Sequence, residues 1–266
     1  MSVVALVNQK GGVGKTTVTL GLAAVAAARG VNVVVIDLDP QSNATSGMGV
    51  WHPTTTVDQA LDAEHPGRIA ELVVDTGWDP ALFARPPRLV PSSPALAARE
   101  PQLVTDPIGA QDRLAVALKG LEADLVLIDC PPSLGLLTVN GLFAADAAVV
   151  VTEPGAWAVD GVAQILRNTT RIAERRNGAL TVGGIVVNRL SRTRDARYWD
   201  EQLVEAHGDA VIRPPIRMRA AITEASAQSL PIVALDRDGA AEAAAEFAAV
   251  LDALTAHLQG EPRGEV

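Results

Sequence analysis

The feature that most constrains this chain is a glycine-rich segment, Lys10 to Thr17, which directly follows an apolar run, Ser2 to Val7. The run is rich enough in β-branched residues to form a buried strand, and the glycines after it let the backbone turn its N–H groups inward. Lys15 adds a positive charge and Thr16 a hydroxyl group, and the helix expected to follow begins with its positive end at the same place. Together these features predict a strand, a loop that binds nucleotide phosphates with Mg²⁺, and a helix.

A second lysine distinguishes this loop from the usual pattern Gly-x-x-x-x-Gly-Lys-Thr. That pattern has glycine where this chain has Gln9, and Lys10 stands beside it. Lysine is a strongly hydrated point charge on a flexible stem, so a loop that already carries Lys15 needs Lys10 only if it meets phosphate elsewhere. The simpler alternative is a solvated surface lysine. The loop resembles the deviant Walker A motif of the ParA/MinD superfamily, and this resemblance implies that Lys10 reaches the nucleotide of a partner subunit.

Strand-like and helical segments alternate almost throughout the 266 residues, which is typical of a parallel sheet covered on both faces. The predicted fold class is therefore α/β, a P-loop NTPase with a mostly parallel, twisted sheet and helices on both faces. With 48% hydrophobic residues the chain can build one large core. We expect a single ATPase domain over residues 1–259 and a flexible tail over residues 260–266.

The pattern predicts strands at Ser2 to Val7, Val31 to Asp37, Arg88 to Val90, Leu125 to Asp129, Ala147 to Thr152, Val182 to Val187 and Ala210 to Ile212. The predicted helices are Thr16 to Arg29, Val57 to Ala63, Ile69 to Val74, Ala95 to Arg99, Asp112 to Leu121, Leu136 to Ala144, Val159 to Asn177, Trp199 to His207 and Gly239 to Leu258. The segment from Leu38 to Gly49 is polar and rich in turn residues. Seven prolines between Thr76 and Pro107 permit only short elements there.

Composition excludes several other classes of protein. The single cysteine, Cys130, rules out a disulfide framework and any Cys-x-x-Cys metal site, and we interpret it as a packing residue. No leader segment or long apolar span is visible, so a cytoplasmic protein that does not insert into membranes is expected. The formal charge of −9 disfavours a protein that is basic over its whole surface.

Carboxylates follow two of the predicted strands. Asp37 and Asp39 stand at the carboxyl end of one strand, in the string Asp-Leu-Asp-Pro-Gln, and Asp129 ends another as the acid of a Walker B motif does. Open α/β sheets bind their ligands at this edge. Asp129 is expected to hold Mg²⁺, a hard cation that prefers oxygen ligands and retains several waters. By resemblance to the ParA family, Asp39 orients the attacking water and Asp37 supports the shell of ligands around Mg²⁺.

An asparagine after a later strand, Asn188, can offer an acceptor and donors to a base edge. In the ParA family an asparagine at this place contacts the adenine, and a segment such as Arg213-Pro214-Pro215 closes over it. A dinucleotide-binding fold is the natural competitor, because Asp37 lies roughly where a ribose-binding acid would stand. Lys15 and Thr16 decide against that fold, since they indicate β- and γ-phosphates with Mg²⁺.

The resemblance covers most of the chain, including a late segment carried by Glu224, Ala225, Pro231, Ile232 and Asp236. The chain is similar to the small ParA/Soj-type partition ATPases. The resemblance implies an ATPase that closes into an ATP-dependent homodimer, binds double-stranded DNA without sequence preference and is released by a ParB-like partner. It also implies association with the nucleoid. Because the first strand begins at residue 2, we expect no N-terminal helix-turn-helix.

A local reversal of charge marks residues 189–219 in this otherwise acidic chain. Such clusters of arginine are the footprint of phosphate binding, although acids interleave here and an ordinary mixed-charge face is the alternative. The expected DNA-binding residues are Arg189, Arg192, Arg213, Arg217 and Arg219. Arg217 and Arg219 are favoured, since no acid lies between Ala210 and Thr223.

Two alternative functions stay open on the sequence alone. A ParA-like protein could position a protein cargo, since the ATPase core would be the same. A MinD-like membrane ATPase needs a basic amphipathic C-terminal helix, whereas Gly239 to Leu258 contains no lysine or arginine, so no membrane partner is expected.

The predicted site is then as follows. The catalytic residues are Lys10, Lys15, Asp39 and Asp129. ATP is bound by Lys10, Gly11, Gly12, Val13, Gly14, Lys15, Thr16, Thr17, Asn188, Pro214 and Pro215. Mg²⁺ is held by Thr16, Asp37 and Asp129.

Overall fold

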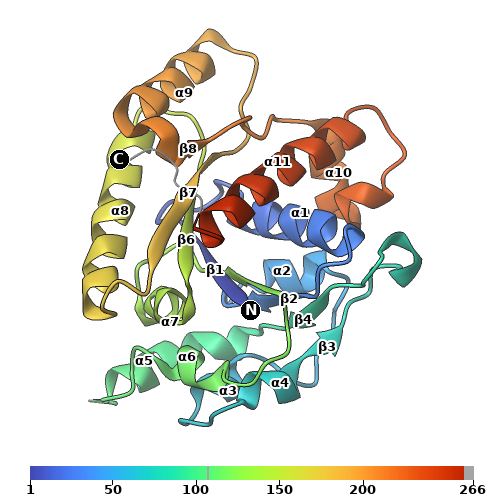
Figure 1. The fold of residues 1–266 in the computed structure, drawn as a ribbon. Helices are drawn as coiled ribbons and strands as arrows, with labels where there is room; N and C mark the ends of the chain where they lie inside the picture. The colour runs from blue at the N-terminus through green and yellow to red at the C-terminus, as the bar shows by residue number, and fades with distance from the viewer. Residues whose placement is uncertain (107, 261–266) are drawn as a thin grey trace.

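The computed structural model describes residues 1–106 and 108–260. Within these residues an eight-stranded sheet has the order β3-β4-β2-β5-β1-β6-β7-β8 (Figure 1). The strands are β1 (Ser2–Val7), β2 (Val33–Asp37), β3 (Val74–Asp75), β4 (Arg88–Val90), β5 (Leu125–Asp129), β6 (Ala147–Thr152), β7 (Thr181–Val187) and β8 (Val211–Ile212). All the strand pairs are parallel except β3 with β4. The predicted α/β class with a mostly parallel sheet is confirmed.

Helices cover both faces of the sheet, as predicted (Figure 1). They are α1 (Lys15–Ala28), α2 (Asn43–Gly47), α3 (Asp58–Leu61), α4 (Arg68–Leu72), α5 (Arg99–Val104), α6 (Arg113–Ala117), α7 (Leu136–Ala144), α8 (Ala158–Arg175), α9 (Arg194–His207), α10 (Ala220–Gln228) and α11 (Ala240–Leu258). Short 3₁₀ turns occur at Pro80–Leu82, Pro94–Ala98, Gly208–Ala210 and Ile232–Ala234.

The core divides into two layers because successive side chains of a strand point to opposite faces. On the central strand β1, Val3, Ala5 and Val7 pack toward α3 to α9, whereas Val4 and Leu6 pack toward α1, α10 and α11. A strand buried on both faces reads as a continuous apolar run, which explains why the central strands were recognisable in the sequence.

Most predicted elements are confirmed, and several differ. Helix α9 begins at Arg194, five residues before the predicted start, because the Thr193 hydroxyl caps it by accepting a hydrogen bond from the Ala196 N–H (3.2 Å). Helices α2, α5 and α10 and strand β3 were not predicted, and the predicted helix Ala95 to Arg99 is instead a 3₁₀ turn, Pro94–Ala98. None of these helices has a side chain that forms a capping hydrogen bond at its first turn, and α2 and α5 are only five and six residues long. The predicted tail lies almost entirely outside the described residues.

The carboxyl ends of the central strands meet at one edge of the sheet. Asp37 at the end of β2 and Asp129 at the end of β5 are paired in register, and the loop after β1 lies next to them. From β1 the chain first adds strands on one side of the sheet and later adds β6, β7 and β8 on the other side. Open α/β sheets bind ligands at the carboxyl ends of the strands at such a switch point. Among the described helices none is long and apolar enough to span a membrane.

Candidate functional site

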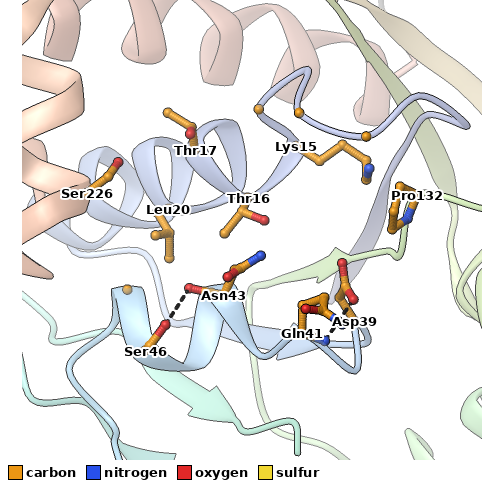
Figure 2. Close-up of a pocket in the computed structure, with 14 residues that line it drawn as sticks. Lys15, Thr16, Thr17, Leu20, Asp39, Gln41, Asn43, Ser46, Pro132 and Ser226 are labelled. Carbon is orange, nitrogen blue, oxygen red and sulfur yellow. Dashed lines mark hydrogen bonds between the residues drawn. The ribbon is translucent and has the colours of Figure 1, made fainter. Parts of the chain in front are cut away.

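The loop after β1 wraps a hollow of about 440 Å³ at this edge. Gly12, Gly14, Lys15 and Thr16 line it from one side, and Asp39, α2 and Pro132 line it from the other (Figure 2). Gly14 has a left-handed backbone (φ 87°), and a Cβ there would collide with the side-chain amide of Asn188. Glycine is therefore required at position 14, where helix α1 begins and its free N–H groups can bind an anion.

Two predicted Mg²⁺ ligands, Thr16 and Asp129, lie in direct contact. The Thr16 hydroxyl donates a hydrogen bond to Asp129 Oδ2 (2.6 Å), and the Thr19 hydroxyl lies 3.3 Å from Asp129 Oδ1. Burial raises the pKa of Asp129, and the nearby carboxylate of Asp37 raises it further. Lys15 lines the hollow, and burial lowers its pKa. The negative charge of Asp129 raises the pKa of Lys15 in part, but burial has the larger effect. A bound group of opposite charge would therefore stabilise the charged form of each of these two side chains.

The donors in this site fit Mg²⁺. A threonine hydroxyl and a carboxylate are the hard oxygen ligands that this ion prefers, and it keeps several waters besides. Among residues 1–106 and 108–260 no cluster of three or more His, Cys, Asp or Glu side chains could hold a metal by itself. A divalent ion held by Thr16 and Asp129 would need further oxygen ligands besides these two side chains.

Asp37 and Asp39 point in different directions. Asp37 is buried and accepts hydrogen bonds from the Thr45 hydroxyl (2.6 Å) and N–H (2.7 Å), which anchors helix α2 to the end of β2. Asp39 lines the hollow, and its carboxylate accepts a hydrogen bond from the Gln41 N–H (3.0 Å). Asp39 thus lies where it can contact a bound phosphate or water, whereas Asp37 is committed to α2. A role for Asp37 next to Mg²⁺ stays a prediction.

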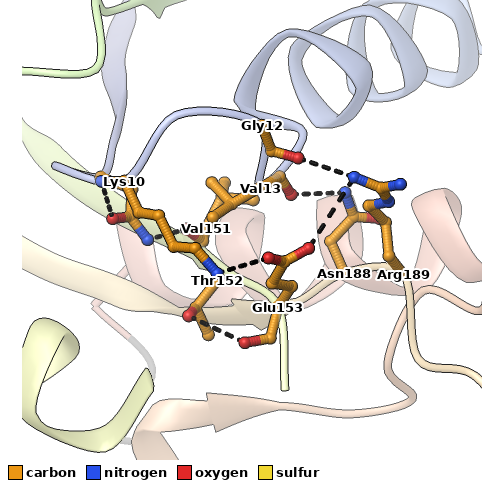
Figure 3. Close-up of polar contacts among 9 residues, drawn as sticks. Lys10, Gly12, Val13, Val151, Thr152, Glu153, Asn188 and Arg189 are labelled. Atoms are coloured by element: carbon orange, nitrogen blue, oxygen red, sulfur yellow. Dashed lines mark hydrogen bonds and ion pairs between the residues drawn. The ribbon is translucent and has the colours of Figure 1, made fainter. Parts of the chain in front are cut away.

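Lys10 does not line the hollow of its own loop. Its side chain is 62% exposed, and Nζ lies 2.6 Å from Glu153 Oε1 just after β6 (Figure 3). Glu153 also faces Arg189 at 3.8 Å. Sequence reasoning missed Glu153, because nothing in the local sequence shows that the end of β6 lies beside the loop after β1.

Asn188 and Arg189, at the end of β7, hold the loop from outside. The Asn188 side-chain amide donates to the carbonyl of Val13, and Arg189 Nη1 donates to that of Gly12, both over 2.9 Å (Figure 3). A second hollow of about 270 Å³ adjoins these residues and is lined also by Thr17, Arg217, Met218, Arg219, Ile222, Thr223 and Ser226. Asn188 therefore lies beside the loop, and its predicted contact with the adenine stays a prediction. The residues from α10 were missed because α10 itself was missed.

Pro214 and Pro215 are not brought to either of these hollows. They line a third one, of about 730 Å³, together with Leu190, Arg192, Arg197 and Arg217. None of the loop residues 10–17 lines it. Contact of the two prolines with ATP stays a prediction without support from this arrangement.

The five arginines proposed for DNA binding fall into two groups. Arg213 forms two hydrogen bonds to Asp200 (2.8 and 2.9 Å), Arg219 binds Glu246 (2.6 Å), and Arg189 is held by Gly12 and Glu153. Arg192 and Arg217 are exposed, and within the described part of the chain their side chains form no hydrogen bond or ion pair. Glu246 also accepts a hydrogen bond from the Arg217 backbone N–H (3.0 Å).

Cys130 is buried among apolar side chains, and burial raises the pKa of its thiol. A protonated, inaccessible thiol is a poor nucleophile, which agrees with its interpretation as a packing residue.

The chain is similar to a known protein family and to curated proteins over most of its length. A family model described as an AAA domain matches residues 1–182. The chain is 34% identical over 242 residues to the sporulation initiation inhibitor protein Soj of Bacillus subtilis, covering 88% of this chain and 91% of that protein. It is 37% identical over 223 residues to the chromosome-partitioning ATPase Soj of Thermus thermophilus, covering 84% and 83%.

A solved structure is similar over nearly the whole fold. Cobyrinic acid a,c-diamide synthase from Mycobacterium smegmatis, with a bound ATP analog and magnesium, superposes with a TM-score of 0.79 at 28% identity. The match covers 98% of this chain and 97% of that one.

Proposed function

Because this chain belongs to the AAA-domain family and, within it, to the ParA/Soj-type P-loop ATPases, we propose that it is a partition ATPase that works as an ATP-dependent homodimer. In this proposal the dimer binds double-stranded DNA without sequence preference. A ParB-like protein then stimulates hydrolysis and releases the dimer from DNA, so the protein would be found on the nucleoid.

ATP with Mg²⁺ is the proposed substrate of the hollow. The loop N–H groups and Lys15 would hold the phosphates, and Thr16 with Asp129 would hold the metal. The similarity to a structure that contains an ATP analog and magnesium supports this assignment. Mg²⁺ would neutralise charge on the β- and γ-phosphate oxygens. Asp39, the carboxylate that lines the hollow, would orient the attacking water.

The position of Lys10 is the observation that carries the dimer. Lys15 is 7% exposed and lines the hollow, whereas Lys10, five residues earlier, is turned away from it toward Glu153. A lysine that does not line its own site but stands on an exposed face next to it can serve the site of a second copy. There it would neutralise the charge that develops during phosphoryl transfer, as an arginine finger does.

The two unpaired arginines support the DNA-binding part of the proposal. Arg192 and Arg217 line the same hollow, on the surface between α9 and the segment after β8. Guanidinium groups without an internal partner are free to contact phosphate. We propose Arg217 and Arg192 as the main DNA contacts, and a lesser role for Arg189, Arg213 and Arg219.

The test uses the variant Asp39→Ala. Without the water-orienting carboxylate, the protein should bind ATP and dimerise but not hydrolyse it, so size-exclusion chromatography with Mg-ATP should show a dimer. The same sample should shift duplex DNA of unrelated sequences equally. A monomer in Mg-ATP would contradict the proposed dimer, and a dimer that leaves DNA unshifted would contradict the DNA-binding part alone.

A further inference from the structure

A buried tryptophan, Trp78, links two elements that form the nucleotide hollow. The side chain is 3% exposed, and its indole N–H lies 3.0 Å from the carbonyl oxygen of Gly47 and 3.1 Å from that of Ser229. Gly47 is the last residue of α2, and Ser229 is the C-cap residue that follows α10. One donor is thus shared between the carboxyl-terminal ends of two helices that are far apart in the sequence.

Both helices contribute walls to the hollow. Ser46 and Gly47 line it from α2, and Ser226 lines it from α10 (Figure 2). Trp78 itself is not among the lining residues. The indole therefore ties the two walls together from behind, without contacting anything bound between them.

The tryptophan is held tightly in place. The Gly77 N–H donates to the Met48 carbonyl (2.8 Å), and a Cβ added at Gly77 would lie only 2.5 Å from the Gly49 oxygen. The indole also stacks on Phe83, with ring centroids 6.0 Å apart and an interplanar angle of 23°. Because the interior is close-packed here, Trp78 cannot shift without moving the chain that leaves α2.

Helix α2 is consequently fixed at two points. Thr45 binds Asp37 at the end of β2, and Gly47 binds Trp78. The residues that α2 presents to the hollow, Asn43, Ser46 and Gly47, all lie within two residues of these points. We propose that Trp78 is a positioning residue of the nucleotide site, whose N–H sets the spacing of α2 and α10 around the bound nucleotide. This inference rests on the proposed binding of ATP in the hollow.

The test is the variant Trp78→Phe, which keeps an aromatic ring beside Phe83 but removes the only N–H donor of the link. Loss of a hydrogen bond of about 1 kcal/mol corresponds to roughly a fivefold change, so the Kd for a fluorescent ATP analogue and the KM for Mg-ATP should rise about fivefold. The kcat should stay within about twofold of the parent, since Lys15, Asp39 and Asp129 are untouched.

The matched control is Phe83→Leu, which removes the stacked ring but leaves both hydrogen bonds of Trp78 in place. It should lower the Tm, as Trp78→Phe does, yet keep the parental KM. A parental KM in Trp78→Phe, or an equal rise of KM in Phe83→Leu, would show that Trp78 only fills the core and would overturn the inference. Failure of the parent protein itself to bind the ATP analogue would instead overturn the proposed function, and this inference with it.

Discussion

The centre of the phosphate-binding loop and the arginine-rich surface of residues 189–219 were both recognised in the sequence. In the structure, the predicted residues come together in the first region but not in the second. At the centre, Lys15 and Thr16 line one hollow, and the Thr16 hydroxyl binds the buried Asp129. On the surface, Arg213 and Arg219 bind the acids Asp200 and Glu246, and only Arg192 and Arg217 of the predicted set have unpaired side chains in the described chain.

The two motifs differ in how much of their geometry is local. The loop motif prescribes its own geometry, because the glycines, the lysine and the helix start are contiguous in the chain. A cluster of arginines does not determine how its side chains are arranged or paired. Whether a guanidinium is free depends on acids elsewhere in the fold, and Glu246 on α11 lies 27 residues from Arg219.

The largest effect is expected at the centre. Lys15→Ala removes the one lysine that lines the hollow, so ATP turnover should fall about 100-fold or more, as is typical when a charge-stabilising group is lost. A steady-state phosphate-release assay measures this. Lys119→Ala, at an exposed position away from the hollow, is the control and should match the parent. Turnover within tenfold of the parent in Lys15→Ala would contradict the role of Lys15 in binding the phosphates.

The next effect separates the two arginines that the sequence favoured equally. Arg217→Glu should weaken duplex DNA binding about tenfold at low salt and flatten its salt dependence, since a phosphate contact is replaced by repulsion. Its Tm should be unchanged. Arg219→Gln should chiefly lower the Tm, because Glu246 is 8% exposed and would lose its cationic partner. Fluorescence anisotropy with labelled DNA and thermal melts report the two effects, and the reverse pattern would contradict the grouping.

The buried carboxyls of Asp37 and Asp129 should make the free energy of unfolding depend on pH, by about 1.4 kcal/mol for each unit of pKa shift. The pKa of Asp129 is raised to about 7 and that of Asp37 to about 6. Unfolded aspartate titrates near 3.9, so between about pH 4 and pH 7 the folded protein binds more protons than the unfolded chain. The free energy of unfolding of the nucleotide-free protein should therefore fall as the pH rises through this window.

The variant Asp129→Asn should reduce that fall, and should be more stable than the parent above about pH 7. Urea titrations at several pH values measure the slope. Asp75→Asn, at an exposed aspartate on β3, is the control and should keep the parental slope. An unchanged slope in Asp129→Asn would show that burial of this carboxyl does not control the pH dependence.

The smallest effect on DNA is expected for Arg213→Ala. Because both hydrogen bonds of this guanidinium go to Asp200, DNA affinity should stay within about twofold of the parent, while the Tm falls by a few degrees. The same anisotropy assay and melt apply. A loss of DNA affinity as large as that in Arg217→Glu would mean that paired and unpaired arginines do not differ in function.

Much of the fold could be predicted because the buried strands read as continuous apolar runs. The strands Leu125–Asp129 and Ala147–Thr152 and the helix Leu136–Ala144 match their predicted bounds residue for residue. Helix α2 was missed because it is only five residues long, and α10 because Arg219, at its N-cap position, is not a capping residue. Thr223 and Ser226, which lie beside the loop, were missed with α10.

The site shows the same limit. The spacing of Asp37 and Asp39 placed both at the sheet edge, but only tertiary contacts show that Thr45 engages Asp37 and leaves Asp39 to face the hollow. The pairing of Lys10 with Glu153, 143 residues away, likewise depends on the neighbouring positions of β1 and β6. Such contacts have no local signal.

Mixing two inactive variants tests the central claim most directly, namely that each copy lends Lys10 to the other. Lys10→Ala keeps Asp39 and Lys15, and Asp39→Ala keeps Lys10, so a mixed dimer contains one complete site. Combined before ATP is added, the two should together recover about a quarter of the parental turnover, since half of the dimers are mixed and each has one working site of two. A mixture no faster than the sum of the separate variants, or Lys10→Ala as fast as the parent by itself, would contradict the account.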